Sequence, residues 1–209
     1  MSAETKTEQT RDRLLNAARE VFSQQGFQGA TVREICRRAE TNVAAVNYHF
    51  GSKDGLLAEA LNFIQLKALQ IANVKADACP EARLHLFIRD FMMMLLDENN
   101  PSSQCQIMAR ELADPTPALD KIVREAIAPL HKFLGELVRE IVGAKTGEAE
   151  LRRCVYSILG QCLLYRHSHP VLQRLHPKLR YDCKEIEAIA AHIADFSLAG
   201  IKQIANKNG

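Results

Sequence analysis

Apolar residues recur at helical spacing along nearly the whole chain. Residues 8–25 carry one apolar stripe, formed by Leu14, Leu15, Ala18, Val21 and Phe22. Residues 31–39 carry a second stripe at positions i, i+3, i+4 and i+7, formed by Val32, Ile35, Cys36 and Ala39. The alternation of apolar and polar residues that is typical of strands persists nowhere. The pattern therefore predicts an all-α protein with about nine helices.

Capping residues and glycines predict where the first helices begin and end. Gly26 is typical of a residue that ends a helix, and Thr31 begins a T-x-x-E capping box that Glu34 completes. After a break at residues 40–43, Asn42 is a suitable N-cap for a short helix that ends near Phe50-Gly51. Ser52 then caps a longer helix, from about residue 53 to residue 75.

The second half of the chain follows a candidate boundary at residues 77–80. Its first helix has a stripe of Leu84, Phe87, Ile88, Phe91 and Leu95, and residues 97–101 end it. Further helices are predicted at 104–113, from Asp114-Pro115 to Val142 with a kink at Pro129, at 151–162 with an end near Pro170, and at 186–197. We predict an N-terminal domain at residues 8–68 and a C-terminal helical bundle at residues 69–209.

Composition narrows the class of protein. The chain has 209 residues, 47% of them hydrophobic and 25% charged, and a formal net charge of +2, which indicates a globular protein that is not uniformly polybasic. No apolar run approaches the ~20 residues that span a bilayer, and residues 1–10 lack the apolar stretch of a signal peptide. The sequence therefore predicts a cytoplasmic protein with no membrane contact.

Cysteine and histidine positions favour neither a metal site nor a cofactor. The six cysteines are scattered without a C-x-x-C motif, so we interpret them as small buried apolar residues. Cys162 lies near three histidines, but the spacing fits no standard zinc pattern: His167, His169 and His176. We expect no bound metal and no cofactor.

Two short helices separated by a brief break are typical of a helix-turn-helix. In the second helix Val46 and Phe50 are spaced to face inward, and a different set faces away: Val43, Ala44, Asn47 and Tyr48. Small side chains at 43 and 44 allow close approach to a DNA groove, and Asn47 suits the N6/N7 edge of adenine. Tyr48, His49, Lys53 and Thr31 suit phosphate oxygens. The same spacing also fits an ordinary pair of core helices.

The residues themselves point to a known family. The run from Thr31 to Ala39, followed by Asn42-Val-Ala-Ala-Val-Asn-Tyr-His-Phe-Gly-Ser-Lys-Asp-Gly-Leu-Leu57, resembles the DNA-binding domain of the TetR family of transcriptional regulators. The resemblance extends back through 22–27 and covers roughly residues 8–68. The sequence of residues 46–53, together with that of residues 160–167, resembles a YbiH/CecR-type subgroup of that family.

This resemblance implies a recognition helix at residues 43–49. It implies that Asn42 belongs to the DNA-binding set, with base or groove contacts from Val43, Ala44 and Asn47, and phosphate contacts from Thr31, Tyr48, His49 and Lys53. The chain departs from the family at Glu40, where Gly is usual, and at Asn47, where an aromatic residue is commoner. A left-handed backbone at Glu40 would be strained, and its charge would lie near phosphates.

In the family, the C-terminal helices bind a ligand and form a homodimer. Independently, specific DNA affinity usually needs two half-sites held by a dimer, which favours a palindromic operator. Candidate dimer helices lie near 148–166 and 184–205, with small residues for close approach at Ser157, Gly160 and Ala190. Several apolar side chains could line a ligand pocket, although the same spacing also fits an ordinary core: Phe87, Phe91, Met92, Met94, Met108, Phe133 and Tyr165. Candidate polar anchors for the ligand are Arg110, Glu111, His131 and Arg166.

The leading hypothesis is therefore a sequence-specific, DNA-binding repressor that a small-molecule effector releases. Lys6, Arg11 and Arg13 are candidates for a basic arm on the DNA backbone. One alternative within the family is an activator or dual regulator. Others are a helical enzyme or carrier, for which no GxSxG, P-loop or HExxH motif is found, and an adaptor that binds protein through its arginine-rich helix.

Overall fold

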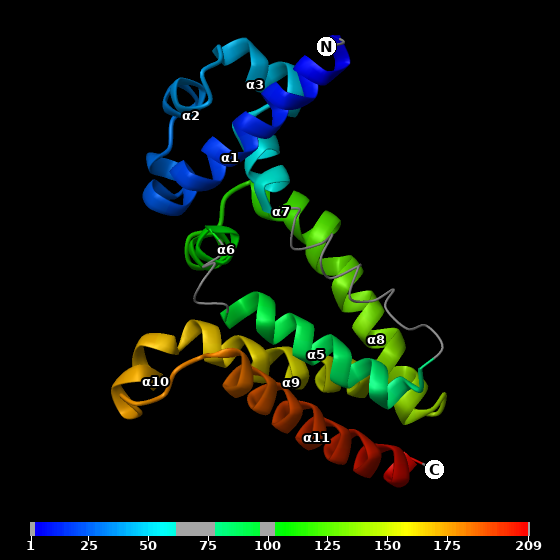
Figure 1. Ribbon diagram of the computed structural model, residues 1–209. Helices are drawn as coiled ribbons and strands as arrows, with labels where there is room; N and C mark the ends of the chain where they lie inside the picture. Colours follow the sequence, from blue (N-terminus) through cyan, green and yellow to red (C-terminus); the bar gives the residue numbers. More distant parts are fainter. Residues whose placement is uncertain (1–2, 62–77, 97–102, 209) are drawn as a thin grey trace. The chain divides into compact units, whose positions relative to one another are not determined.

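The computed structural model describes residues 3–61, 78–96 and 103–208, and every regular element in these ranges is helical. The predicted all-α class is confirmed. The elements run α1 (Ala3–Gly29), α2 (Val32–Arg38), α3 (Val43–Phe50), a helical segment at 53–61, α5 (Pro80–Leu96), α6 (Ser103–Ala113), α7 (Ala118–Ile122), the π-helical turn η1 (Val123–Ile127), α8 (Ala128–Val142), α9 (Glu148–His167), α10 (His169–Leu175) and α11 (Cys183–Asn208) (Figure 1).

The chain forms two compact units. The first contains residues 1–66 and 103–128, and the second contains residues 67–102 and 129–209. Since the first unit is assembled from two separate stretches of chain, it does not correspond to a single cut in the sequence. The domain boundary placed at residues 68 and 69 stays a prediction.

The core of the first unit lies where α1 meets α2, α3 and α6. The stripe predicted for the first helix is buried there, together with Ile35 of α2 and Val46 of α3. Burying a large apolar side chain contributes about 1.5–3 kcal/mol, so these contacts dominate the stability of short helices that would not persist alone. In Figure 1, α2 and α3 both lie against α1.

Gly26 breaks α1 three residues before its end. Its backbone is left-handed, with φ 71° and ψ 178°, so the helix end predicted at this residue appears as a break followed by one more turn. A Cβ atom at this position would lie 3.2 Å from Nη1 of Arg110. Both the backbone angle and the close approach of Arg110 therefore favour glycine here.

The core of the second unit forms around α5, which packs against α9 and α11 (Figure 1). The predicted α5 stripe is buried, and the rings of Phe87 and Phe91 stack with centroids 5.6 Å apart. The ring centroid of Phe133 in α8 lies 5.9 Å from that of Phe87. Ala190 of α11 is also buried, at 2% exposure, so its predicted place on an outward dimer face is wrong.

One helix begins later than the sequence indicated. We predicted Asp114 as the cap and Pro115 as the first helical residue, but α7 begins at Ala118. The buried Glu111 carboxylate accepts hydrogen bonds from the Thr116 backbone N–H at 2.8 Å and from its hydroxyl at 2.7 Å. Thr116 Oγ1 in turn accepts from the Ala118 N–H at 3.2 Å. The start of α7 thus depends on a buried acceptor in the preceding helix α6, which the local sequence around residues 114–118 does not reveal.

The kink predicted at Pro129 takes the form of the π-helical turn η1, in which the Ala128 N–H donates to the Val123 carbonyl. Proline cannot donate a backbone hydrogen bond, and its ring clashes with the carbonyl four residues earlier. A wider turn directly before Pro129 gives its ring room beside that carbonyl. The short helix α10, which begins at His169 with Pro170 in its first turn, was not predicted.

Candidate nucleic-acid interface

Side-chain caps set the starts of α2 and α3, as predicted. Thr31 Oγ1 accepts from the Glu34 N–H at 3.2 Å, and Asn42 Oδ1 accepts from the Ala45 N–H at 3.0 Å. Each cap satisfies a backbone donor that the first helical turn leaves free. At the other end of α3, Gly51 has φ 74° and donates its N–H to the Asn47 carbonyl at 3.0 Å. These local bonds define an eight-residue helix directly after the turn.

The turn between α2 and α3 contains a strained residue. Glu40 has φ 51°, which confirms the left-handed conformation expected where the family usually has glycine. The Thr41 N–H donates to the Cys36 carbonyl at 3.0 Å, and the Cys36 thiol donates to the Asn42 carbonyl at 3.4 Å. The Glu40 carboxylate is exposed and lies 3.9 Å from Nη1 of Arg13.

The two faces of α3 have opposite character. Val46 and Phe50 are buried, and Phe50 also receives the Arg11 guanidinium 5.5 Å from its ring centroid. The opposite face is exposed, and its side chains are those predicted to read DNA: Val43, Ala44, Asn47 and Tyr48. Tyr48 is 78% exposed, so its hydroxyl is free of the protein core. The structure therefore presents one small, mixed apolar and polar surface of the kind that enters a DNA groove.

The predicted phosphate ligands lie at the edges of that surface. Thr31 is exposed at the start of α2, and its hydroxyl keeps a hydrogen for a further acceptor while it caps the helix. The His49 ring lies 4.9 Å from that of Tyr48 in an edge-to-face arrangement. Lys53 is half-buried, and its ammonium lies 4.2 Å from the centroid of the Phe27 ring. Partial burial lowers the pKa of Lys53, and the charge of Asp54 opposes that shift.

The predicted basic arm is only partly available. Arg11 donates to the Glu59 carboxylate at 2.8 Å, so this guanidinium is held within the first unit, and its place in a basic arm stays a prediction. Arg13 is half exposed and faces Glu40. The side chain of Lys6 lies outside the described part of the chain.

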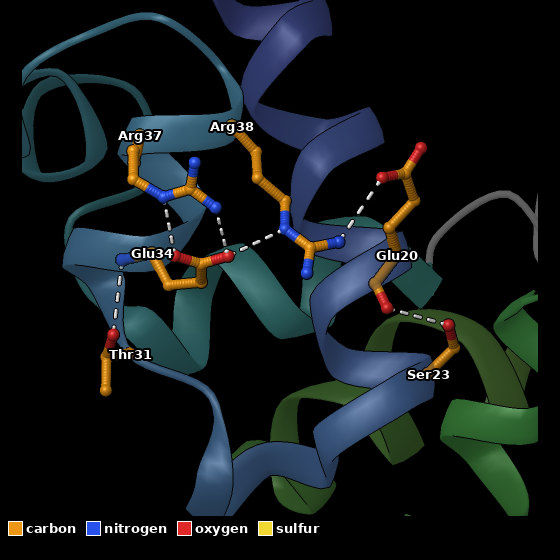
Figure 2. Close-up of polar contacts among 6 residues, drawn as sticks. All are labelled: Glu20, Ser23, Thr31, Glu34, Arg37 and Arg38. Carbon is orange, nitrogen blue, oxygen red and sulfur yellow. Dashed lines mark hydrogen bonds and ion pairs between the residues drawn. The ribbon is translucent and has the colours of Figure 1, made fainter.

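A charge cluster on α2 was not predicted as a unit (Figure 2). The Glu34 carboxylate accepts two bonds from Arg37 and one from Arg38, each at 2.8 Å. Arg38 also reaches Glu20 of α1 at 3.6 Å. Hydrogen bonds from the two guanidinium groups lower the pKa of Glu34 to about 2. The carboxylate thus turns to the arginines instead of the Thr31 N–H that a complete capping box would bind.

Sequence reasoning missed the fixed orientation of Arg37, which stays exposed on the last turn of α2 while Glu34 holds it. The available signal was the spacing of the acid three and four residues before two arginines, which favours ion pairs on one helix face. The same spacing occurs on many solvated helices, so it does not single out this surface.

The candidate ligand residues fall into two groups. Phe87 and Phe91 belong to the buried core of the second unit, which also holds the half-buried Met94. His131 lines a groove of about 360 Å³ between α8 and α9, and its Nε2 atom is buried without a hydrogen-bond partner. The Tyr165 ring lies 6.5 Å from that of Tyr181.

Arg166 belongs to α9 in the second unit, whereas Arg110 and Glu111 lie in the first unit. Arg110 donates to the Gln24 carbonyl at 3.3 Å beside a cavity of about 270 Å³, and Glu111 is committed to Thr116. Met108 packs against the core of the same unit. The candidate ligand residues are therefore divided between the two units, with Phe87, Phe91, Met94, His131 and Tyr165 in the second and Arg110 in the first. Sequence alone did not reveal this, because α6 follows α5 in the chain but belongs to the other unit.

Among the residues that the structure describes, no three histidine, cysteine or acidic side chains are placed together to hold a metal ion. No helix among them has both the length and the apolar character needed to cross a bilayer.

Comparison with known proteins agrees with this geometry. The family model for bacterial regulatory proteins of the tetR family matches residues 14–60, and the model for the C-terminal domain of the HTH-type transcriptional dual regulator CecR matches residues 80–201. The chain is 27% identical to CecR of Shigella flexneri over 95% of both chains.

Solved structures show the same fold. A transcriptional regulator of Rhodococcus sp. Rha1 is 26% identical, with a TM-score of 0.63 over 92% of this chain and 96% of that one. AibR, solved in complex with isovaleryl coenzyme A and operator DNA, has a TM-score of 0.65 at 18% identity, over 90% of this chain and 97% of that one.

Replacing Glu40 by glycine separates strain from charge. A left-handed residue with a Cβ atom costs about 1–2 kcal/mol, and glycine loses about 0.5–1 kcal/mol of chain entropy, so we expect Glu40→Gly to stabilise folding by about 0.5–1 kcal/mol. Urea unfolding measures this gain. Glu40→Ala keeps the Cβ atom and is the matched control, with no gain expected. Both variants remove a negative charge, so both are expected to strengthen binding to duplex DNA. Equal free energies of unfolding for the two variants would show that the backbone at Glu40 is not strained.

Glu34 makes stability depend on pH. Its folded pKa of about 2 lies below the ordinary value of 4.5, so its ion pairs stabilise the fold above about pH 4.5 and are lost as pH falls toward 2. We expect the Tm of Glu34→Gln to lie below wild type at neutral pH, with the gap closing in acid. Glu136→Gln, which removes only an exposed pair with Lys132, is the control. A gap that stays constant with pH would show that ionisation of Glu34 is not its source.

Proposed function

The chain belongs to the TetR family of bacterial regulatory proteins, in the group with a CecR-type C-terminal domain, and we propose that it is a dimeric repressor that a small molecule releases from a palindromic operator. Its relatives are transcriptional regulators, which are not enzymes. The observation that carries the proposal is the outer face of α3, which is exposed while its inner face is buried.

We assign base recognition to the residues on that outer face. Asn47 offers a donor and an acceptor, which match the N7 and N6 groups of adenine in the major groove. Val43 and Ala44 are small and apolar, so they allow close approach and suit contact with a thymine methyl. They lie in the first turn of α3, next to the cap Asn42, which is the end that enters the groove in helix-turn-helix proteins.

Phosphate contacts position α3 in the groove. We assign them to Thr31, Tyr48, His49 and Lys53, which border the outer face. Each contact between a cation and a phosphate releases counterions, so affinity for any duplex falls as salt rises. Glu40 opposes this attraction, because its exposed carboxylate lies in the turn beside α3.

Exposed apolar residues on α9 and α11 support a homodimer. Tyr156, Leu164 and Phe196 are more than half exposed, and a groove of about 250 Å³ runs between the two helices beside Phe196. A Cβ atom added at Gly160 or Gly200 would touch nothing, which leaves room for a partner helix to approach closely. Ser157 lines the same groove. A second copy that covers these residues would hold two α3 helices for two half-sites.

We place the effector in the second unit, with His131 as its polar anchor. The buried Nε2 atom without a partner is costly, and a ligand group that bonds to it would recover that cost. An effector that favours a conformation with poor operator affinity must itself bind less tightly in the presence of operator, by the same factor. This reciprocity is measurable once a ligand is found.

Dual regulation is the second candidate mode, because the relative from Shigella flexneri that matches 95% of the chain is named a dual regulator. Transcription in vitro from a promoter that carries the selected operator separates the two modes. A repressor lowers transcript from every position of the operator that overlaps the promoter. A dual regulator raises transcript from upstream positions.

Selection of duplexes from a random pool tests DNA reading by α3. We expect a palindromic consensus, and we expect Asn47→Ala to lose about 1–3 kcal/mol on the selected duplex while it tolerates changes at one base pair of each half-site. Tyr48→Phe, which removes only a hydroxyl, should weaken selected and unrelated duplexes alike. Gln203→Ala on α11 is the control with no expected effect. If Asn47→Ala kept both affinity and base preference, α3 would not be the reading helix.

Placing one charge on the proposed dimer face tests the interface. Phe196→Glu buries an unpaired carboxylate if α11 packs against a partner, so we expect monomers by analytical ultracentrifugation at micromolar concentration. Affinity for the palindrome should fall, while affinity for a single half-site stays unchanged. Val171→Glu on α10 is the matched control, because Val171 is similarly exposed. Monomers from Val171→Glu, with dimers from Phe196→Glu, would move the interface to α10.

A further inference from the structure

The break at Gly26 places two aromatic rings together. In an unbroken α-helix, residues five apart lie roughly 140° apart around the axis, so Phe22 and Phe27 would point in different directions. Because the backbone turns at Gly26, the two rings instead stack with centroids 6.0 Å apart and planes 25° apart. Phe22 is fully buried, and it therefore anchors Phe27 against the core of the first unit.

The Phe27 ring also receives a cation. The Lys53 ammonium lies 4.2 Å from the ring centroid, within the range at which the negative face of an aromatic ring attracts a positive charge. Lys53 begins the helical segment that Ser52 caps through a 3.0 Å bond from the Gly55 N–H. The ring and the ammonium thus come from two segments that are each fixed locally, one by a glycine and the other by a cap.

We propose that Phe27 is a positioning residue for DNA binding, because its ring holds the Lys53 ammonium in place for a phosphate of the duplex. The inference rests on the proposed phosphate contact of Lys53. A free lysine side chain loses rotamer freedom when it binds a phosphate, and the ring removes part of that cost beforehand. An ammonium has three donors, so a phosphate on the solvent side can be bound while the aromatic contact is kept.

Substitutions at Phe27 test this positioning with a duplex of fixed, unrelated sequence, since phosphate binding does not depend on sequence. Phe27→Leu keeps apolar volume and removes the aromatic face, and we expect it to weaken binding about two- to fivefold for each bound chain. Phe27→Tyr keeps the aromatic face and should bind as wild type does. Lys53→Gln should weaken binding and lower the slope of log affinity against log salt by about 1 for each chain.

The double variant separates positioning from a purely structural role. If Phe27 acts through Lys53, Phe27→Leu causes no further loss in the Lys53→Gln background. An equal loss in both backgrounds, or wild-type affinity of Phe27→Leu, overturns the proposal. Thermal unfolding of every variant shows whether a loss of affinity follows a loss of folded protein.

A measurement without DNA tests the contact itself. A methylene group beside an aromatic face resonates upfield, so the Lys53 ε-CH2 signals should be shifted in wild type and Phe27→Tyr and unshifted in Phe27→Leu. Unshifted signals in wild type overturn the inference. If wild type binds no duplex, the proposed function fails and this inference with it, whereas normal DNA binding by Lys53→Gln refutes only the role of Lys53 and Phe27.

Discussion

The recognition surface depends on the burial of one side of α3. A helix of eight residues is not stable alone in water, because the cost of nucleation exceeds what so few backbone bonds return. Val46 and Phe50 supply the missing stability by packing into the core that α1 and α2 form. Their burial also sets the rotation of the helix about its axis. The opposite face, with Asn47 and Tyr48, is exposed as a consequence of that rotation.

Carboxylates offset much of the positive charge around this core. Several arginines of the first unit are held by carboxylates, such as Arg11 by Glu59 and Arg37 by Glu34. These pairs orient side chains and reduce the net positive charge close to the DNA-facing surface. Affinity then depends on a few well-placed donors more than on a broad basic patch, which agrees with the formal charge of only +2.

The second unit combines a well-packed core with features that its own residues leave unsatisfied. Its phenylalanines stack closely, whereas Tyr156 and Phe196 remain exposed and His131 keeps a buried nitrogen without a partner. Large exposed apolar residues on adjacent helices are typical of protein interfaces, and orphaned polar atoms are typical of functional sites. The proposed dimer site follows from the exposed apolar side chains, and the proposed effector site follows from the buried nitrogen of His131.

Local sequence determined the features whose causes are local. The caps Thr31 and Asn42, the strained turn at Glu40, the buried face of α3 and the apolar stripe of α5 were all predicted, because each depends on residues within about one or two helical turns.

Only the tertiary structure decided which distant residues meet. It placed α6 with the first unit, where Arg110 reaches Gln24. It turned Ala190 into the core, and it brought Lys53 onto the ring of Phe27. These pairings follow from the way amphipathic helices cover one another. Helical periodicity states which face of each helix is buried, but it does not state which partner buries it.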